Sequence, residues 1–460
     1  LYYFSRKSHR FQSSFSCKIC CIYVTLYKYM KKIKPIHIFL ILNGLGVLTF
    51  IVLNRITNGY FFEEDFFELT GDAIYDFFVF LNQNSTSTVA FTTGSNPPLV
   101  RFIFRFIFKC LPVSVQESHP DVHLWPEPEN DLRVNAFAFV SFFLLFMIAI
   151  VYMTKLCAEK LNASNLQKNI FIVLSLFSTG VIWAIERGNI VIWAMVCTMY
   201  FCFNYESDDT KKREISYLML GIAISLKIYP SLFCILLLKN KDWKAIFKTI
   251  VYVMLFTILP LALSGGIPTI IGYISSLFNQ VSASSNLRAG YLNGLSVMLT
   301  IYRAFGNEDA FLEKIWFFRI FNYVFCIVIS FAAVYLTNKN WVKITTLIFA
   351  MYLLPGITHT YMLSFILIPL VLFFNEEQNI TVENSIAMIG FLLLTTLLPI
   401  KNGNIVSVLR DPTVVNVANR LSGIMLIHIC GEIILTIIIF IEIVKGFVCF
   451  VKNTKTYLSH

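Results

Sequence analysis

Long apolar runs alternate along this chain with short segments that carry charged residues or histidine. The runs 38–53, 134–153 and 421–441 are continuous, whereas the strands of a membrane barrel would alternate apolar and polar residues. A helix needs about 20 apolar residues to cross about 30 Å of hydrocarbon, and only helices or closed barrels satisfy their backbone there. The pattern therefore predicts an all-α polytopic membrane protein.

Composition agrees with this class and excludes others. Of the 460 residues, 57% are hydrophobic and only 14% are charged, which is atypical of a soluble protein. The net charge of +10 comes from basic residues beside the apolar runs, so it indicates topology and excludes a nucleic-acid partner. Most of the cysteines fall within predicted spans, and Cys17, Cys20 and Cys21 make only half a zinc site, so we expect no metal there.

Lysine and arginine predict the orientation of the chain. The basic segment 1–36 holds eight of them and no acidic residue, so we expect the N-terminus in the cytoplasm. Further lysines mark internal loops and a cytoplasmic tail at 445–460. Satisfying every cluster within the transmembrane domain 37–444 takes about ten to twelve crossings. Because Met30 directly precedes three of these lysines, we keep open that residues 1–29 are not part of the working protein.

The longest polar stretch, 58–133, is rich in acidic residues and is predicted to be the first extracytoplasmic loop. Its part 71–82 has helical spacing, with Asp72 and Asp76 one turn apart on one side and apolar residues on another. Such a helix would lie on the membrane surface. After the break at Pro97 and Pro98, the amphipathic segment 99–111 presents a basic face formed by Arg101, Arg105 and Lys109.

Four other polar motifs fall on the same predicted face. The motif 186–189 forms the turn of a helical hairpin, 227–230 interrupts the run 215–238, 358–361 divides the run 345–374, and 401–420 is a late loop. Since 215–238 is basic at both ends, the positive-inside rule puts Lys227 at the outer tip of two half-helices.

Ionisable residues at membrane depth cost about 2.5–3.5 kcal/mol each and usually mark a site. Taken singly, these residues have ordinary explanations. Arg187 fits an interfacial anchor, Lys227 a side chain that snorkels to the headgroups, His359 a structural residue, and Asp72 a solvated charge. Their combination on one face indicates a functional site.

The order and spacing of these motifs resemble those of GT-C fold glycosyltransferases, and specifically of glycosyltransferase family 87, whose members include polyprenol-phosphate-mannose-dependent mannosyltransferases. The resemblance covers about residues 38–370. It is carried by GDAIYDFF at 71–78, by Pro97-Pro98-Leu99, by Gly188-Asn189, by LKIYP at 226–230, by NGLS at 293–296 and by THTYMLSFILIP at 358–369.

The resemblance implies an integral membrane hexosyltransferase with a large first extracytoplasmic loop. It would move a hexose, mannose in the named enzymes, from a polyprenol-phosphate donor to a lipid or glycan acceptor on the outer face of the cell membrane, with inversion and without metal or cofactor. In that interpretation Asp72 is the general base. The donor phosphate would be bound by Lys227, Arg187, Tyr229 and His359, and the substrates by Tyr75, Asn189 and Asp76.

Two other classes stay open from the residues alone. Broken helices that carry a lysine also occur in transporters and flippases, although those repeat the breaks in both halves of the chain, and this chain shows no such correspondence. O-antigen polymerases and ligases depend on arginine-rich late loops, whereas the late loop here holds only Arg410 and Arg420. We therefore favour the transferase.

Overall fold

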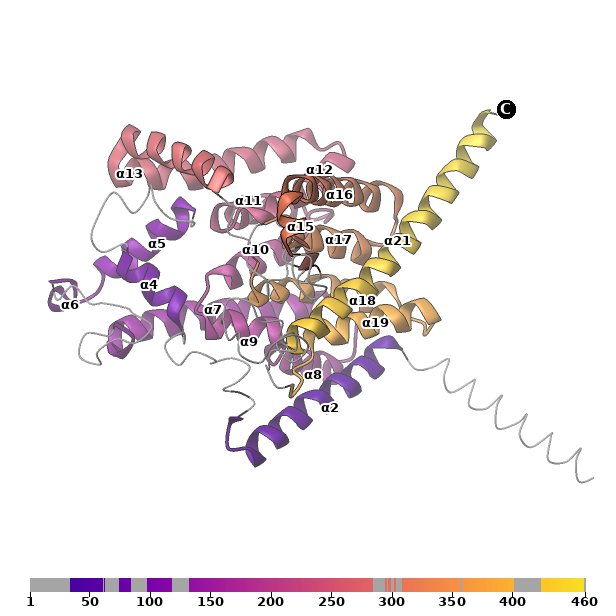
Figure 1. Cartoon of the computed structure of the whole chain (residues 1–460), viewed down its shortest axis with the longest axis horizontal. Helices are drawn as coiled ribbons and strands as arrows, with labels where there is room; N and C mark the ends of the chain where they lie inside the picture. Colours follow the sequence, from indigo (N-terminus) through magenta and orange to yellow (C-terminus); the bar gives the residue numbers. More distant parts are fainter. Residues whose placement is uncertain are drawn as a thin grey trace, which may run out of the picture.

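The computed structural model describes residues 34–60, 62, 74–83, 97–117, 132–283, 294–295, 297–298, 302, 308–355, 358–400 and 423–458. Every regular element within these ranges is a helix, as the sequence predicts (Figure 1). In chain order the helices are α2 (Pro35–Ile56), α4 (Tyr75–Gln83), α5 (Pro98–Lys109), α6 (Val113–Glu117), η4 (Leu132–Val134), α7 (Ala136–Lys160), α8 (Asn165–Leu176), α9 (Thr179–Glu186), α10 (Val191–Asn204), α11 (Thr210–Leu226), η5 (Tyr229–Phe233), α12 (Cys234–Lys239), α13 (Trp243–Ala283), α15 (Glu308–Glu313), α16 (Ile315–Leu336), α17 (Asn340–Leu353), η6 (Thr360–Ile366), α18 (Leu367–Glu376), α19 (Val382–Thr395) and α21 (Gly423–Leu458).

Within the described ranges, five helices are long and apolar enough to cross a membrane: α2, α7, the part Trp243–Ser275 of α13, α16 and α21. They include the three long apolar runs that the sequence showed. The pair α8 and α9, bent by 47°, makes a sixth if it counts as one span. The other predicted crossings fall on apolar helices of 10–17 residues, which at 1.5 Å per residue are shorter than the hydrocarbon layer.

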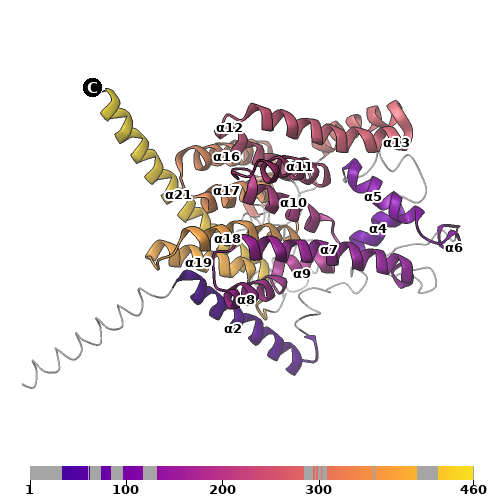
Figure 2. The same cartoon turned by 180° about the vertical axis from the view of Figure 1, so that it is seen from behind.

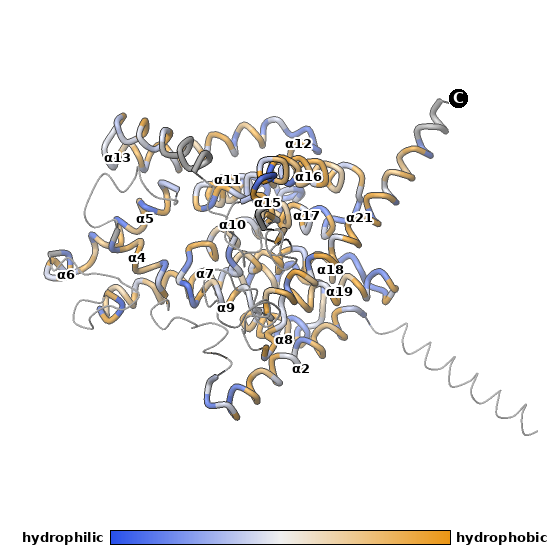
Figure 3. The backbone as a smooth tube through the Cα atoms, viewed as in Figure 1, coloured by the Kyte–Doolittle hydropathy of each residue, from blue (hydrophilic) through white to orange (hydrophobic). Residues whose placement is uncertain are grey.

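The long helices surround a buried interior. They turn large apolar side chains outward, among them Ile41 of α2 and Phe317 of α16, which are 62% and 65% exposed. Residues 341–352 of α17 are instead all buried. Apolar side chains gain nothing from facing water, so an apolar exterior of this kind is expected of a protein surrounded by lipid. Figure 3 shows hydrophobic residues along these outer helices.

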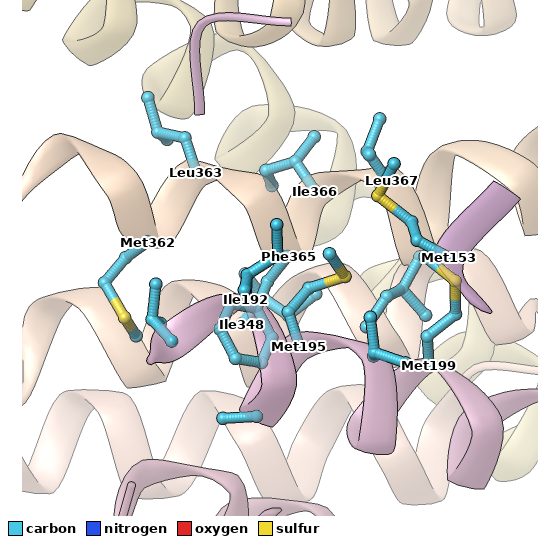
Figure 4. Packing of buried hydrophobic residues seen from close by; sticks show 14 of the residues in the cluster. Met153, Ile192, Met195, Met199, Ile348, Met362, Leu363, Phe365, Ile366 and Leu367 are labelled. Carbon is cyan, nitrogen blue, oxygen red and sulfur yellow. The ribbon is translucent and has the colours of Figure 1, made fainter. Parts of the chain in front are cut away.

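The centre of the bundle is packed with flexible and branched apolar side chains. Met195 and Met199 of α10 lie with Ile348 of α17 and Phe365 of η6 in one buried cluster (Figure 4). Gly180 of α9 lets η6 approach closely, because a Cβ at this position would collide with the backbone of Leu363 and Ser364. Small residues at such crossings are typical of helix packing in membranes.

The short connection between α10 and α11 places the start of α10 and the end of α11 at the same end of the bundle. We call this the motif end. The opposite end, the lysine end, holds the starts of α11 and α17 together with Lys339, which pairs with Glu377 at 2.8 Å and with Glu442 at 3.3 Å. Residues 445–458 of the predicted tail continue α21 as helix. Figures 1 and 2 show α4 and α5 on the side of the bundle away from the C-terminus.

Candidate active site

The start of α4 is bound to the turn that follows α9, more than 100 residues later in the chain. The backbone N–H of Asp76 donates to the carbonyl of Arg187 at 2.9 Å, and that of Ile74 donates to the carbonyl of Glu186. Gly188 has a φ of +62°, and a Cβ on it would lie 2.9 Å from the Cβ of Phe77. Glycine is thus required here both for the left-handed turn and for the close approach of α4.

The apolar face of α4 is covered by protein. Phe77 and Phe78 are fully buried, and the ring centroid of Phe77 lies 5.1 Å from that of Phe104 in α5 and 5.3 Å from that of Phe142 in α7. The apolar face of α4 therefore packs on protein, whereas the sequence analysis expected it to face the membrane surface. The packing of this apolar face holds Asp76, at the start of α4, beside the turn that follows α9.

Asp76 joins the two residues that flank Gly188. Its Oδ1 accepts from Arg187 Nη2 at 2.9 Å and its Oδ2 accepts from Asn189 Nδ2 at 2.7 Å. The Asn189 Oδ1 in turn accepts from the backbone N–H of Val191 at the start of α10. The Arg187 and Asp76 side chains are 18% and 14% exposed, so water screens this pair only in part. Because both of its oxygens accept hydrogen bonds, Asp76 is well suited to position its neighbours and poorly placed to take a proton.

Tyr75 completes this group. The guanidinium carbon of Arg187 lies 5.8 Å from the centroid of the Tyr75 ring, within the range of a cation–π contact. Four of the residues predicted as site residues, Tyr75, Asp76, Arg187 and Asn189, are therefore in direct contact. We call them the Asp76 cluster.

Lys227 lies at the predicted break in the chain. Helix α11 ends at Leu226 and η5 begins at Tyr229, since Pro230 lacks the N–H that a continuing helix would need. Burial lowers the pKa of the Lys227 ammonium, and the Asp76 carboxylate opposes that shift in part. In the described part of the chain its Nζ forms no hydrogen bond or ion pair. The ammonium group of Lys227 is therefore available to bind an anionic ligand.

Tyr229 and His359 also belong to the motif end. Tyr229 follows Lys227 by two residues, and its side chain is half-buried. His359 precedes η6 at the predicted break between α17 and α18, and its ring stacks on Tyr361 with centroids 5.2 Å apart. Neither Tyr229 nor His359 is one of the four residues of the Asp76 cluster.

Several predicted positions lie outside the described residues: Asp72, the acidic group Glu63, Glu64 and Asp65, and the late loop with Arg410. Among the residues that are described, no group of three or more His, Cys, Asp or Glu side chains is placed to hold a metal ion.

The sequence analysis assigned no individual role to two charged residues that are buried in the structure. Arg101 appeared there only as one of three residues on a basic face, yet it is 7% exposed and lies close to Tyr273 of α13. Glu186, which is 6% exposed, directly precedes Arg187. Periodicity identifies the helix of Arg101, but it does not show which of the three basic side chains another helix covers.

Comparison with known proteins gives one match. The model of glycosyltransferase family 87 matches residues 131–364, a range that contains Arg187, Lys227 and His359 and begins after α4. No curated protein and no solved structure matches the chain.

Proposed function

Because this chain belongs to glycosyltransferase family 87 and is therefore a glycosyltransferase, we propose that it moves a hexose from a polyprenol-phosphate donor to a lipid or glycan acceptor. We further propose that the hexose is mannose and that the protein has the GT-C fold, with ten to twelve membrane helices. The transfer takes place at the motif end of the bundle. No metal or cofactor takes part in the proposed reaction.

The observation that carries this proposal is the position of Lys227 beside the Asp76 cluster. Departure of a lipid phosphate needs cations where negative charge develops, in a site from which water is partly excluded. Lys227 is such a cation, and its charge is within range of the Asp76 carboxylate. Arg187 adds a planar guanidinium whose remaining N–H groups suit phosphate oxygens. Tyr229 and His359 supply further donors to the phosphate.

The proposed base is Asp72. Asp76 has both oxygens engaged by Arg187 and Asn189, so we assign the role of base to Asp72, the other aspartate of the motif 71–78. Asp72 takes the proton of the acceptor hydroxyl while the acceptor oxygen bonds to the anomeric carbon. The bond from that carbon to the phosphate oxygen breaks, and its electron pair leaves with the lipid phosphate. A single displacement inverts the anomeric centre.

The remaining residues of the cluster position the substrates. Asn189 is fixed between Asp76 and the start of α10, and Tyr75 presents its ring against Arg187. Such fixed groups lower the barrier by holding reacting atoms in line. Asp76, which anchors both Arg187 and Asn189, is a positioning residue in this account.

The distribution of lysine supports an extracytoplasmic site. Lys160, Lys212 and Lys343 lie together at the lysine end, and basic residues beside membrane helices favour the cytoplasm. In the proposal both termini are cytoplasmic and the motif end faces the outside of the plasma or inner membrane.

Transfer of radiolabelled hexose by the purified protein in detergent tests this function. With a lipid extract as acceptor, we expect label to move from a synthetic polyprenol-phosphate-hexose and not from the corresponding nucleotide sugar. Parallel donors that carry mannose, glucose or galactose identify the sugar. Transfer from the nucleotide sugar alone would contradict the proposed donor class.

A further inference from the structure

A polar cleft of about 400 Å³ opens at the lysine end. It is formed by the ends of α7 and α10 and the starts of α11 and α17, and its lining includes Lys160, Lys212, Lys343, Glu206, Asn340 and Leu372. Helix α10 runs from the Asp76 cluster to this cleft, and 14 residues at 1.5 Å each separate the two by about 20 Å. The cleft is therefore distinct from the proposed transfer site.

Lys343, in the first turn of α17, is the most enclosed charge in the cleft. It is 6% exposed, and its Nζ donates to the neutral Asn340 Oδ1 at 2.9 Å. Lys239 at the end of α12 lies within reach of the same ammonium group. Burial and this neighbouring charge together lower the pKa of Lys343. Two ammonium groups held together away from water repel each other unless an anion lies between them.

Lys160 adds a third ammonium group. Its Nζ donates to the carbonyl oxygen of Phe203 at 3.0 Å and lies 5.7 Å from the centroid of the Phe203 ring. Like Lys343, it thus faces a neutral acceptor.

The nearby carboxylates are engaged elsewhere. Glu376 and Glu206 both act on Lys160 and Lys343, but Glu376 accepts from the backbone N–H of Asn340 and Glu206 accepts from Asn240. At the rim, Glu159 pairs with Lys155 at 3.9 Å, and Asp208 adds another acid. Lys160, Lys212 and Lys343 line the cleft together with Glu159, Glu206 and Asp208. Within the described residues, however, no carboxylate is hydrogen-bonded to the close pair Lys343 and Lys239.

We propose that this cleft binds a phosphate group through Lys343, Lys239 and Lys160. Lysine ammonium groups bind phosphate as point charges. Lys160 and Lys343 in the lining, with Lys239 beside Lys343, suit an anion with more than one charge. The cleft volume leaves room for the group that carries the phosphate. That group is either the headgroup of an anionic lipid in the adjacent leaflet or a soluble phosphate ester.

Thermal unfolding of the purified full chain in detergent tests the inference, with inorganic phosphate as the first probe and potassium chloride at equal ionic strength as the salt control. Phosphate should raise the melting temperature of the wild type. Lys343→Met keeps the length of the side chain and removes its charge, so it should need at least about tenfold more phosphate for the same shift, as expected for a lost charge-assisted hydrogen bond. Lys211→Met is the matched control, because Lys211 is exposed at the same end but does not line the cleft.

The melting temperature measured without phosphate separates a phosphate-binding role of Lys343 from a purely structural role. Without phosphate, Lys343→Met should melt no lower than the wild type, because the substitution removes an ammonium group that repels Lys239. A lower melting temperature without phosphate, together with an unchanged response to phosphate, would make Lys343 a structural residue and overturn the proposal.

Nanodiscs identify the source of the phosphate. Stabilisation by phosphatidic acid over phosphatidylcholine, beyond the effect of inorganic phosphate, assigns a lipid headgroup. Stabilisation by inorganic phosphate alone assigns a soluble ester. An effect of neither probe overturns the site. None of these melting-temperature measurements depends on sugar transfer. Their outcome therefore tests the phosphate site independently of the proposed donor.

Discussion

Asp72→Asn should lower hexose transfer by about 10²–10⁴-fold, the usual contribution of a general base, while the melting temperature stays unchanged. Asparagine keeps the shape of the side chain but cannot take the proton of the acceptor hydroxyl. The expectation follows from the neighbouring acid, since Asp76 has both oxygens occupied by Arg187 and Asn189. Initial rates of label transfer, compared with melting curves of the same preparations, check it.

Asp76→Asn is the matched comparison for this substitution. It makes the same chemical change four residues further along the chain and removes the charge that holds Arg187. Since the pair is mostly buried, its loss should lower the melting temperature as well as the rate. Full activity of Asp72→Asn beside an inactive but stable Asp76→Asn would transfer the role of base to Asp76.

Lys227→Ala should raise the KM for the polyprenol-phosphate donor by about 10–100-fold and change the KM for the acceptor little. Hydrogen bonds to charged groups contribute about 1.5–3 kcal/mol, which corresponds to that range of affinity. The ammonium group is available for this role because it forms no ion pair within the described residues. Steady-state kinetics with each substrate varied in turn measure the effect.

Lys227→Arg is the control for charge. It keeps the cation but replaces a compact ammonium group with a wide planar one, so the KM for the donor should fall between those of wild type and Lys227→Ala. Unchanged donor kinetics in the alanine variant would remove Lys227 from the phosphate site. A loss of kcat alone would instead assign it to the transition state.

The helix breaks were predictable because their causes are local. Pro230 ends α11 through its missing N–H, and the polar residues 358–361 interrupt an apolar run, so the structure confirms both breaks. The surroundings of α4 were not predictable in this way. Its apolar face would suit contact with lipid or with protein equally well. The side chains that cover it, Phe104 and Phe142, belong to helices outside the motif.

The candidate site was predictable as a set of residues but not as a set of contacts. Sequence order put Asp76, Arg187 and Asn189 on one face, and the structure confirms that they meet. It also shows that Asp76 pairs with Arg187, a residue 111 positions later that no spacing rule connects with it. Lys343 illustrates the same limit at the other end, because the sequence marks it only as a cytoplasmic lysine, whereas its burial depends on how α12 and α17 pack.

Photocrosslinking with a diazirine-bearing polyprenol-phosphate-hexose, followed by mass spectrometry of the purified protein, tests most directly whether the donor binds at the motif end. We expect adducts on the peptides that carry residues 74–83, 183–191 and 224–233, and we expect unlabelled donor to suppress them. Adducts confined to the cleft around Lys343, with none at the motif end, would contradict the assignment of the transfer site.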